Sequence, residues 1–137
     1  MAYPDVEFVL KKLNEMGIVT AIVTDAPKTK AYQRLLSMQI ESYFRFVVGF
    51  EDTGNGKHTG LPLKLALNKL RKEVPDLVNS EILMVGDSIE RDIEPAKKLG
   101  LITAISKYGQ RENATSDSID YELTALIDLL QVIQQSK

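Results

Sequence analysis

The apolar run Ile82-Leu83-Met84-Val85 is followed directly by Gly86-Asp87-Ser88-Ile89-Glu90-Arg91-Asp92. Four consecutive apolar residues indicate a buried strand, which places Asp87 at the carboxyl end of that strand. In open α/β sheets, ligands bind at this edge. Asp92 comes five residues later, as the next helix begins, so both carboxylates can face a common point. Carboxylate oxygens are hard ligands that suit Mg²⁺, and the segment therefore predicts a magnesium site.

Apolar runs and helical patterns alternate along the rest of the chain. The first helix has apolar residues at helical spacing from Val6 to Met16 and stops at Gly17. Further helices are expected after Pro27, over 61–74, from the acidic segment to about Leu99, and over 121–133. The expected strands are 18–23, part of 44–50, 82–85 and 101–105, and the long polar loops are 51–60 and 110–118.

This alternation predicts a parallel sheet with right-handed crossovers and helices on both faces. The chain has 137 residues, which is the length of one domain, and it contains no repeat, low-complexity tract or linker. We therefore expect a single α/β domain over residues 1–137, with the three-layer Rossmann-like arrangement.

Composition excludes several classes of function. A net charge of -2 gives no reason to expect a nucleic acid or a membrane surface as partner. The absence of cysteine excludes a disulfide framework, a thiolate metal site and a thiol nucleophile. No apolar stretch approaches the roughly 20 residues of a spanning helix. A cytoplasmic protein is the default expectation.

Three further segments, taken with the acidic one, resemble a known family. The order Ile22-Val23-Thr24-Asp25, then Lys57, then Val85-Gly86-Asp87-Ser88 with Asp92, is similar to the motif order of the haloacid dehalogenase (HAD) superfamily of phosphohydrolases. The similarity runs from Pro4 to the last helix. It implies the HAD-like form of the Rossmann fold, Mg²⁺ as cofactor and a small phosphorylated metabolite as substrate.

The resemblance also implies a role for each matched residue. Thr24 falls on the strand-end Ser or Thr that hydrogen-bonds the phosphoryl group, and Asp25 beside it is counted with the substrate-binding residues. Lys57 falls on the catalytic cation, which also contacts the substrate. Asp87 and Asp92 fall on the metal-binding acids. The prolines usual around the lysine are replaced here by His58 and Gly60.

Simpler interpretations of the same residues stay open. Thr24 and Asp25 before a proline are typical of a turn or helix cap. Lys57 is typical of a solvated loop, and Lys64 is a rival for its role. His58, the only histidine, is expected to be a solvated loop residue. Asp87 is also well placed to cap the following helix, and Asp92 is well placed to interact with the positive end of that helix.

One family motif has no counterpart in the chain. The family's first motif is an Asp-x-Asp after an amino-terminal strand, and its leading Asp is the nucleophile. No Asp-x-Asp occurs in the chain, and its first expected strand, 18–23, already matches the second motif. We therefore expect the first strand, the nucleophile and the cap domain to be missing, as in a truncated form or after a late start codon.

Three functions follow from this pattern. The first is a HAD-like phosphatase, Mg²⁺-dependent when complete and inactive as this chain alone. The second is a regulatory module that binds phosphate and metal without turnover. The third is a half that needs a complementary chain. In the family the missing strand lies between the strands ending at Val23 and Val85, so we expect these two to close up and pair directly, with a tendency to dimerise, or a second chain to fill the gap.

Overall fold

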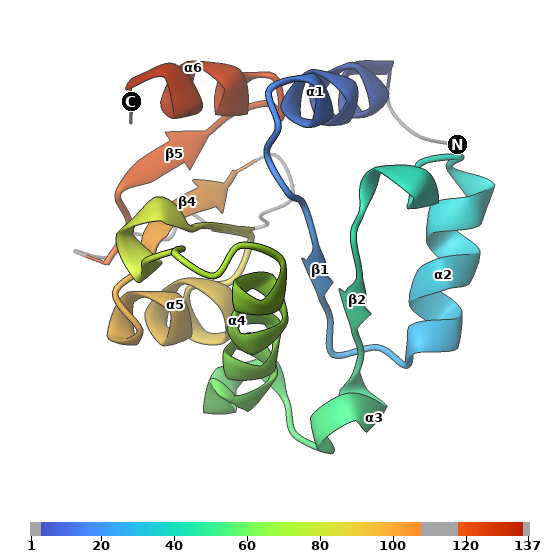
Figure 1. Cartoon of the computed structure of the whole chain (residues 1–137), viewed down its shortest axis with the longest axis vertical. Coiled ribbons are helices and arrows are strands. Elements are labelled where there is room, and N and C mark those ends of the chain that lie inside the picture. Colours follow the sequence, from blue (N-terminus) through green and yellow to red (C-terminus); the bar gives the residue numbers. More distant parts are fainter. Residues whose placement is uncertain (1–3, 108–117, 136–137) are drawn as a thin grey trace.

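The computed structural model describes residues 4–107 and 118–135. Short parallel strands lie between two layers of helices, which confirms the expected three-layer α/β class (Figure 1). The elements, in chain order, are α1 (Pro4–Glu15), β1 (Ile22–Val23), α2 (Lys28–Ser37), the short helix η1 (Glu41–Tyr43), β2 (Val47–Val48), α3 (Phe50–Thr53), η2 (Lys57–Thr59), α4 (Leu61–Glu73), η3 (Asn79–Glu81), β3 (Leu83–Gly86), the π-turn η4 (Ile89–Ile93), α5 (Glu94–Lys98), β4 (Ile102–Ser106), β5 (Tyr121–Leu123) and α6 (Asp128–Gln135).

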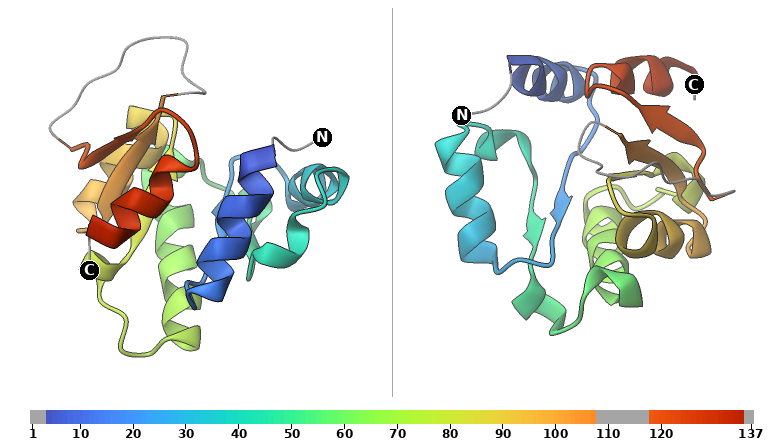
Figure 2. Two further views of the ribbon diagram at one scale, coloured as in Figure 1. Left: turned by 90° about the horizontal axis from the view of Figure 1, so that it is seen from above. Right: turned by 180° about the vertical axis from the view of Figure 1, so that it is seen from behind.

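The strands form two groups rather than one continuous sheet. β1 pairs in parallel with β2, and Val23 lies opposite Val48. β4 lies between β3 and β5 and is parallel to both, with Val85 opposite Ala104. Figure 1 and the right view of Figure 2 show the pair β1–β2 standing apart from the group that contains β4 and β5.

The expected direct pairing of residues 82–85 with 18–23 is therefore wrong. Within the described part of the chain, β1 and β3 share no ladder. The helix α1 packs on both groups of strands. Its Val9 and Leu13 join the core over β4 and β5, whereas its Leu10 joins the core over β2. α1 therefore bridges the two groups of strands without bringing β1 into a ladder with β3.

Two helical layers enclose the strands. On one face α1, α2 and α6 contribute Leu13, Leu35 and Val132 to the buried core. On the other face α4 and α5 pack together through Leu67 and Ala96. The side chains of β3 alternate between these layers: Leu83 and Val85 pack toward α1 and α6, and Ile82 and Met84 toward α4 and α5. Among the described residues, no helix is long and apolar enough to cross a membrane.

Several element boundaries differ from those expected. The final helix begins at Asp128 and not at residue 121, because Tyr121–Leu123 pair with β4 as strand β5. The strand expected within 44–50 is β2, and the polar loop expected over 51–60 contains two helical turns. The helix after β3 is broken into η4 and α5, since Pro95 has no N–H to donate within it. The expected loop 110–118 lies almost wholly outside the described residues.

Candidate active site

The carboxyl end of β1 carries Thr24 and Asp25. The backbone N–H of Thr24 donates to the carbonyl of Val48 at 2.9 Å, which fixes Thr24 as the last paired residue of the strand. Its hydroxyl accepts a hydrogen bond from the N–H of Ala26 at 3.1 Å. The turn expected from the Thr-Asp-x-Pro pattern is therefore present, and it holds the Thr24 hydroxyl at the strand end.

Asp25 ties this strand end to the short helix η2. Its Oδ1 accepts a hydrogen bond of 2.7 Å from the backbone N–H of Lys57. Its Oδ2 lies 3.7 Å from Nη1 of Arg91, an exposed side chain on η4. Asp25 thus links three segments that are far apart in sequence, and it positions Lys57 through the backbone rather than through the ammonium group.

Lys57 projects its side chain toward the end of β3. Its Nζ lies 2.6 Å from Oδ1 of Asp92, and the two side chains are only 18% and 2% exposed. The contact is a close ion pair rather than a well-directed hydrogen bond. The other oxygen of Asp92, Oδ2, accepts from the backbone N–H of Ser88 at 3.2 Å. A buried carboxylate needs such compensation because removing a charge from water is costly.

Gly86 allows Asp92 to approach the strand. A Cβ placed on Gly86 would lie 2.4 Å from Cγ of Asp92, closer than real atoms come. Ser88 then caps the helical turn η4, since its Oγ accepts from the N–H of Arg91 at 3.1 Å. Two residues of the Gly-Asp-Ser segment therefore have local structural roles. Gly86 makes room for Asp92, and Ser88 begins the helical turn that carries Asp92.

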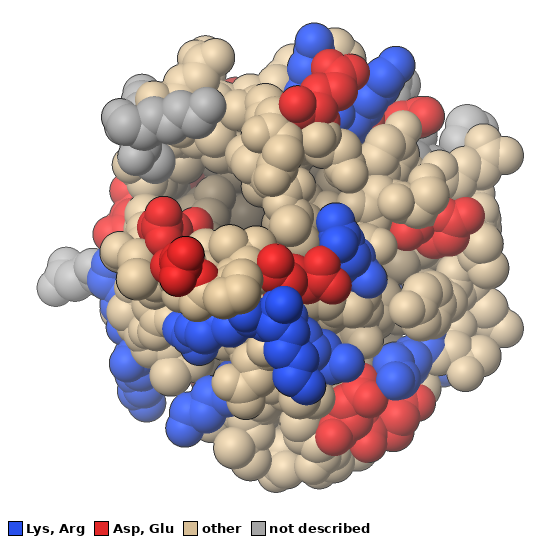
Figure 3. All heavy atoms as spheres, in the orientation of Figure 1, with Lys and Arg blue, Asp and Glu red and all other residues tan. Residues whose placement is uncertain are grey.

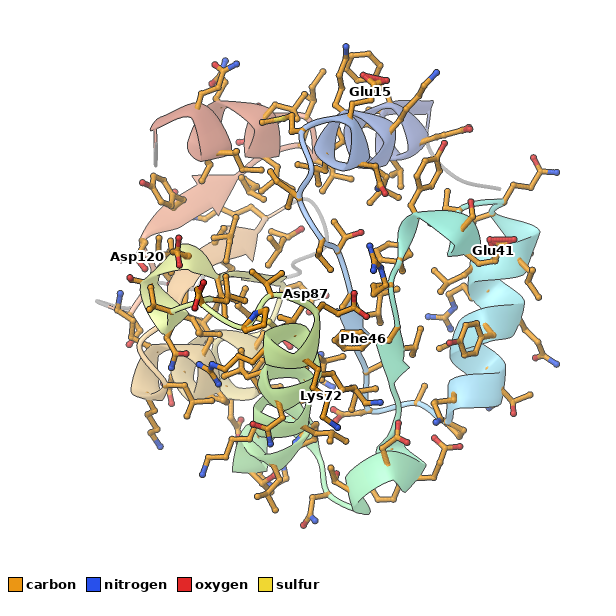
Figure 4. The ribbon with its side chains drawn as sticks, in the orientation of Figure 1. Glu15, Glu41, Phe46, Lys72, Asp87 and Asp120 are labelled. Carbon is orange, nitrogen blue, oxygen red and sulfur yellow. The ribbon has the colours of Figure 1, made fainter. Side chains whose placement is uncertain are left out.

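Asp87 is an exposed carboxylate at the carboxyl end of β3. Figure 4 shows it near the centre of the molecule, whereas Asp120 lies on the far side of the β3–β4–β5 group. The donor chemistry fits Mg²⁺, which binds one or two carboxylates and keeps several waters. No group of three His, Cys, Asp or Glu side chains comes together in the part of the chain that the structure describes, so the protein supplies few ligands here. The metal roles of Asp87 and Asp92 stay a prediction.

The structure brings most of the expected site residues to one place. Thr24 and Asp25 follow β1, Asp87 and Asp92 follow β3, and Lys57 contacts both groups. The carboxyl ends of the two strands therefore meet, although the strands themselves do not pair. Two cations, Lys57 and Arg91, lie beside the carboxylates of Asp92 and Asp25 respectively. Figure 3 shows basic and acidic side chains side by side across the middle of the face that is turned to the viewer.

Lys64, the alternative to Lys57, and His58 both lie outside this cluster. Lys64 is exposed on α4, and the solvated position expected for His58 agrees with its exposed side chain. Both line a shallow pocket with Lys98, and none of the cluster residues belongs to it. Sequence reasoning missed Arg91 and Ser88 as parts of the site. Their position between the two acids was the available signal, but nothing in the sequence alone shows that Arg91 turns toward Asp25.

A family model agrees with this geometry. Residues 1–105 match the model described as haloacid dehalogenase-like hydrolase. The chain belongs to this family. Among curated relatives, the glyceraldehyde 3-phosphate phosphatase of Methanocaldococcus jannaschii is 29% identical over 136 residues, a match that covers 98% of this chain and 58% of that protein. Other relatives are named pyrophosphatase and phosphoglycolate phosphatase.

Solved structures show the same fold. The HAD phosphatase from Thermococcus onnurineus superposes with a TM-score of 0.81 at 27% identity, covering 97% of this chain and 58% of that one. The HAD-hydrolase YfnB from Bacillus subtilis, described as bound to magnesium, gives a TM-score of 0.74 at 22% identity, covering 93% of this chain and 52% of that one. The chain thus spans little more than half the length of these relatives.

Proposed function

We propose that this HAD-family chain supplies the phosphate-binding half of an Mg²⁺-dependent phosphatase that acts on a small phosphorylated metabolite. The observation that carries the proposal is the meeting of Lys57, Asp25 and Asp92 at the carboxyl ends of β1 and β3. Family membership and the phosphatase names of several relatives support the reaction class.

Each residue has a role that phosphoryl transfer requires. The reaction depends mainly on positioning and on neutralising charge on the phosphoryl oxygens. The Thr24 hydroxyl is a donor at the end of β1, and Lys57 is a nearly buried cation. Asp25 is a positioning residue that holds the Lys57 backbone. Asp87, with Asp92 beside it, would hold Mg²⁺, which when bound supplies positive charge for the phosphoryl oxygens.

The same charges indicate that phosphate binding depends on the metal. Lys57 is engaged with Asp92, and Arg91 faces Asp25. A phosphate dianion that approaches this cluster meets cations that are already paired with carboxylates, and a divalent cation at Asp87 would add positive charge beside them. We therefore expect weak phosphate binding without Mg²⁺ and tighter binding with it.

The attacking group is assigned to a segment outside residues 1–137. An Asp-x-Asp sequence is absent from the chain, and the cluster shows no other carboxylate for which the family resemblance gives a nucleophilic role. Covalent phosphoryl transfer needs a positioned acceptor, and positioning residues do not replace it. We therefore propose that these 137 residues bind phosphate without turning it over.

Titration with inorganic phosphate tests the proposal. The probe is phosphate with and without Mg²⁺, followed by the NMR shifts of the Thr24 and Lys57 amides. We expect millimolar binding with Mg²⁺, on the order of 4 kcal/mol, and roughly tenfold weaker binding in Lys57→Met. Lys64→Met removes an exposed lysine from α4 and is the matched control. Binding that is unchanged by Lys57→Met would contradict the assignment of the site.

A further inference from the structure

The charged side chains of the candidate site become more exposed from the inside outward. Asp92 is 2% exposed, and its partner Lys57 is 18% exposed. Asp25 is 33% exposed, and its neighbour Arg91 is 56% exposed. Acids and bases alternate in this series, and Asp25 joins its two halves by accepting the backbone N–H of Lys57. Lys57 is therefore the inner cation of the site, and Arg91 is the outer one.

The turn η4 carries both an inward acid and an outward cation. It is a π-helical turn, a wide form of helix that occurs often at functional sites. Asp92 is buried against Gly86 at the end of β3, whereas Arg91, the residue before it, stays at the surface. One short turn thus supplies the acid that holds Lys57 and a second cation on the solvent side of the site.

Ser88 orients the side chain of Arg91. Its Oγ accepts a hydrogen bond of 3.1 Å from the backbone N–H of Arg91 and makes a longer contact of 3.5 Å with the side-chain Nε. Because a guanidinium is planar and rigid, a contact at Nε restricts the direction of both terminal amino groups. Arg91 is therefore partly oriented before any ligand binds, which lowers the conformational entropy that binding would cost.

The terminal amino groups of Arg91 have donors to spare. Nη1 lies 3.7 Å from Oδ2 of Asp25, which is longer than a hydrogen bond. Within the described part of the chain, the only hydrogen-bond acceptor found for this side chain is Ser88. An exposed ion pair of this kind contributes little to stability, so Arg91 can leave Asp25 for a ligand at low cost. Paired guanidinium donors match the oxygens of a carboxylate or a phosphate.

We propose that Arg91 is a specificity-determining residue, which binds a second anionic group, a carboxylate or a phosphate, on the same phosphorylated substrate. This inference rests on the proposed function, because it takes the transferred phosphate to bind at Thr24 and Lys57. With the inner cation occupied by that phosphate, the outer cation lies beside the part of the substrate that faces solvent. A phosphate ester without a second charge would leave Arg91 unused.

The binding of phosphonates tests the proposal. Methylphosphonate carries one anionic group, whereas phosphonoacetate adds a carboxylate and methylenediphosphonate adds a second phosphonate. Affinities are measured from the NMR shifts of the Thr24 and Lys57 amides, with free Mg²⁺ held constant because the two larger probes also bind the metal in solution. We expect at least one of these probes to bind about tenfold more tightly than methylphosphonate. The probe with the larger gain identifies the second group as carboxylate or phosphate.

Arg91→Gln separates this role from phosphate binding. It should abolish the preference for a second anionic group, while the affinity for methylphosphonate falls by no more than about threefold, since Lys57 is intact. Arg91→Lys keeps the charge but loses the paired donors, so it should retain only part of the preference. Arg34→Gln removes an exposed arginine from α2 and is the matched control, in which all these affinities should be unchanged.

The outcomes distinguish a failure of this inference from a failure of the proposed function. A preference that persists in Arg91→Gln, or none in the parent protein, would overturn the role of Arg91 while methylphosphonate binding leaves the phosphate site in place. An equal loss of affinity for every probe in Arg91→Gln would also overturn it, because Arg91 would then act on the phosphate itself. If no probe shifts the Thr24 and Lys57 amides, the proposed phosphate site is wrong, and the role of Arg91 is wrong with it.

Discussion

Lys57 Nζ lies 2.6 Å from Oδ1 of Asp92, a side chain that is 2% exposed. The pair connects η2 with the helix that follows β3, and it is the closest link between the two sides of the candidate site. Asp25 reinforces it by accepting the backbone N–H of Lys57. The same lysine therefore has a structural role, because it compensates a buried carboxylate, and a proposed role in binding phosphate.

Lys57→Met should destabilise the fold. It leaves the buried Asp92 carboxylate without its cation, and breaking a buried pair on one side costs about 3 kcal/mol. Urea unfolding measured at neutral pH gives the free energy directly. Lys64→Met removes an exposed lysine and should change stability by less than about 0.5 kcal/mol. Equal losses of unfolding free energy in the two variants would show that the Lys57–Asp92 pair does not stabilise the fold.

Gly86→Ala should destabilise the fold by a steric clash of the added Cβ, and not by straining the backbone conformation. The added Cβ would lie 2.4 Å from Asp92 atoms, and relieving such overpacking costs about 1 to 3 kcal/mol. The control is Gly100→Asn. Gly100 has φ +79, a conformation that Asn tolerates, and a Cβ added there would have one neighbouring atom, at 3.9 Å. Thermal unfolding of both variants decides the point, and a Gly86→Ala protein as stable as the parent would mean that Asp92 does not lie against the strand.

The ionisation of Asp120 should make the free energy of unfolding depend on pH in the acid range. Burial alone would raise the pKa of Asp120, but hydrogen bonds from Lys97 and from the backbone and hydroxyl of Thr103 outweigh it and lower the pKa below its usual value. A carboxylate with a depressed folded-state pKa stabilises the protein above its ordinary pKa of about 3.9, and this stabilisation is lost as pH falls through the lower value.

Asp120→Asn should therefore cost about 1 kcal/mol at pH 7, because solvent screens this partly exposed side chain, and it should remove part of the acid dependence below about pH 4. Urea midpoints measured from pH 7 down to about pH 2 compare the slopes of the two proteins. Identical slopes would contradict the depressed pKa of Asp120.

Magnesium should bind weakly to the chain by itself. Asp87 is the exposed carboxylate at the end of β3, and Mg²⁺ with few protein ligands keeps most of its waters. Calorimetric titration should give a dissociation constant no tighter than about 1 mM, which corresponds to ~4 kcal/mol. Asp87→Asn should weaken it further, whereas Glu90→Gln, which changes an exposed acid nearby, should not. Micromolar binding that survives Asp87→Asn would place the ligands elsewhere.

The fold class could be predicted because its signals are local. Helices such as α1 and α4 show clear apolar periodicity, and the glycines that follow α1 and α5 adopt positive φ, where a side chain would be strained. The strand at 121–123 could not be separated from the final helix, because its assignment depends on pairing with β4. The pairing of β1 with β3 was predicted wrongly because strand neighbours are a tertiary property that apolar periodicity does not record.

The sequence could predict which residues belong to the candidate site, but it could not predict the contacts that these residues make. An acid placed directly after an apolar strand pointed to Asp87, and the family resemblance pointed to Asp25 and Asp92. The structure joins Asp25 and Asp92 through Lys57 and places Asp87 at the end of β3. The sequence could not show that Asp92 turns inward against Gly86 while Asp87 is exposed, because both follow the same strand. That difference depends on the register of η4, which Ser88 sets by capping its first turn.

A phosphatase assay of the purified 137 residues tests the central claim, that the chain carries a phosphate site without the attacking carboxylate. With an aryl phosphate and Mg²⁺, we predict no hydrolysis above the uncatalysed rate, and the same absence in Asp87→Ala. Inorganic phosphate binding, measured on the same preparation, shows that the protein is folded and its site intact. Hydrolysis that follows the protein through purification and disappears in Asp87→Ala would contradict the account, because the chain would then contain its own nucleophile.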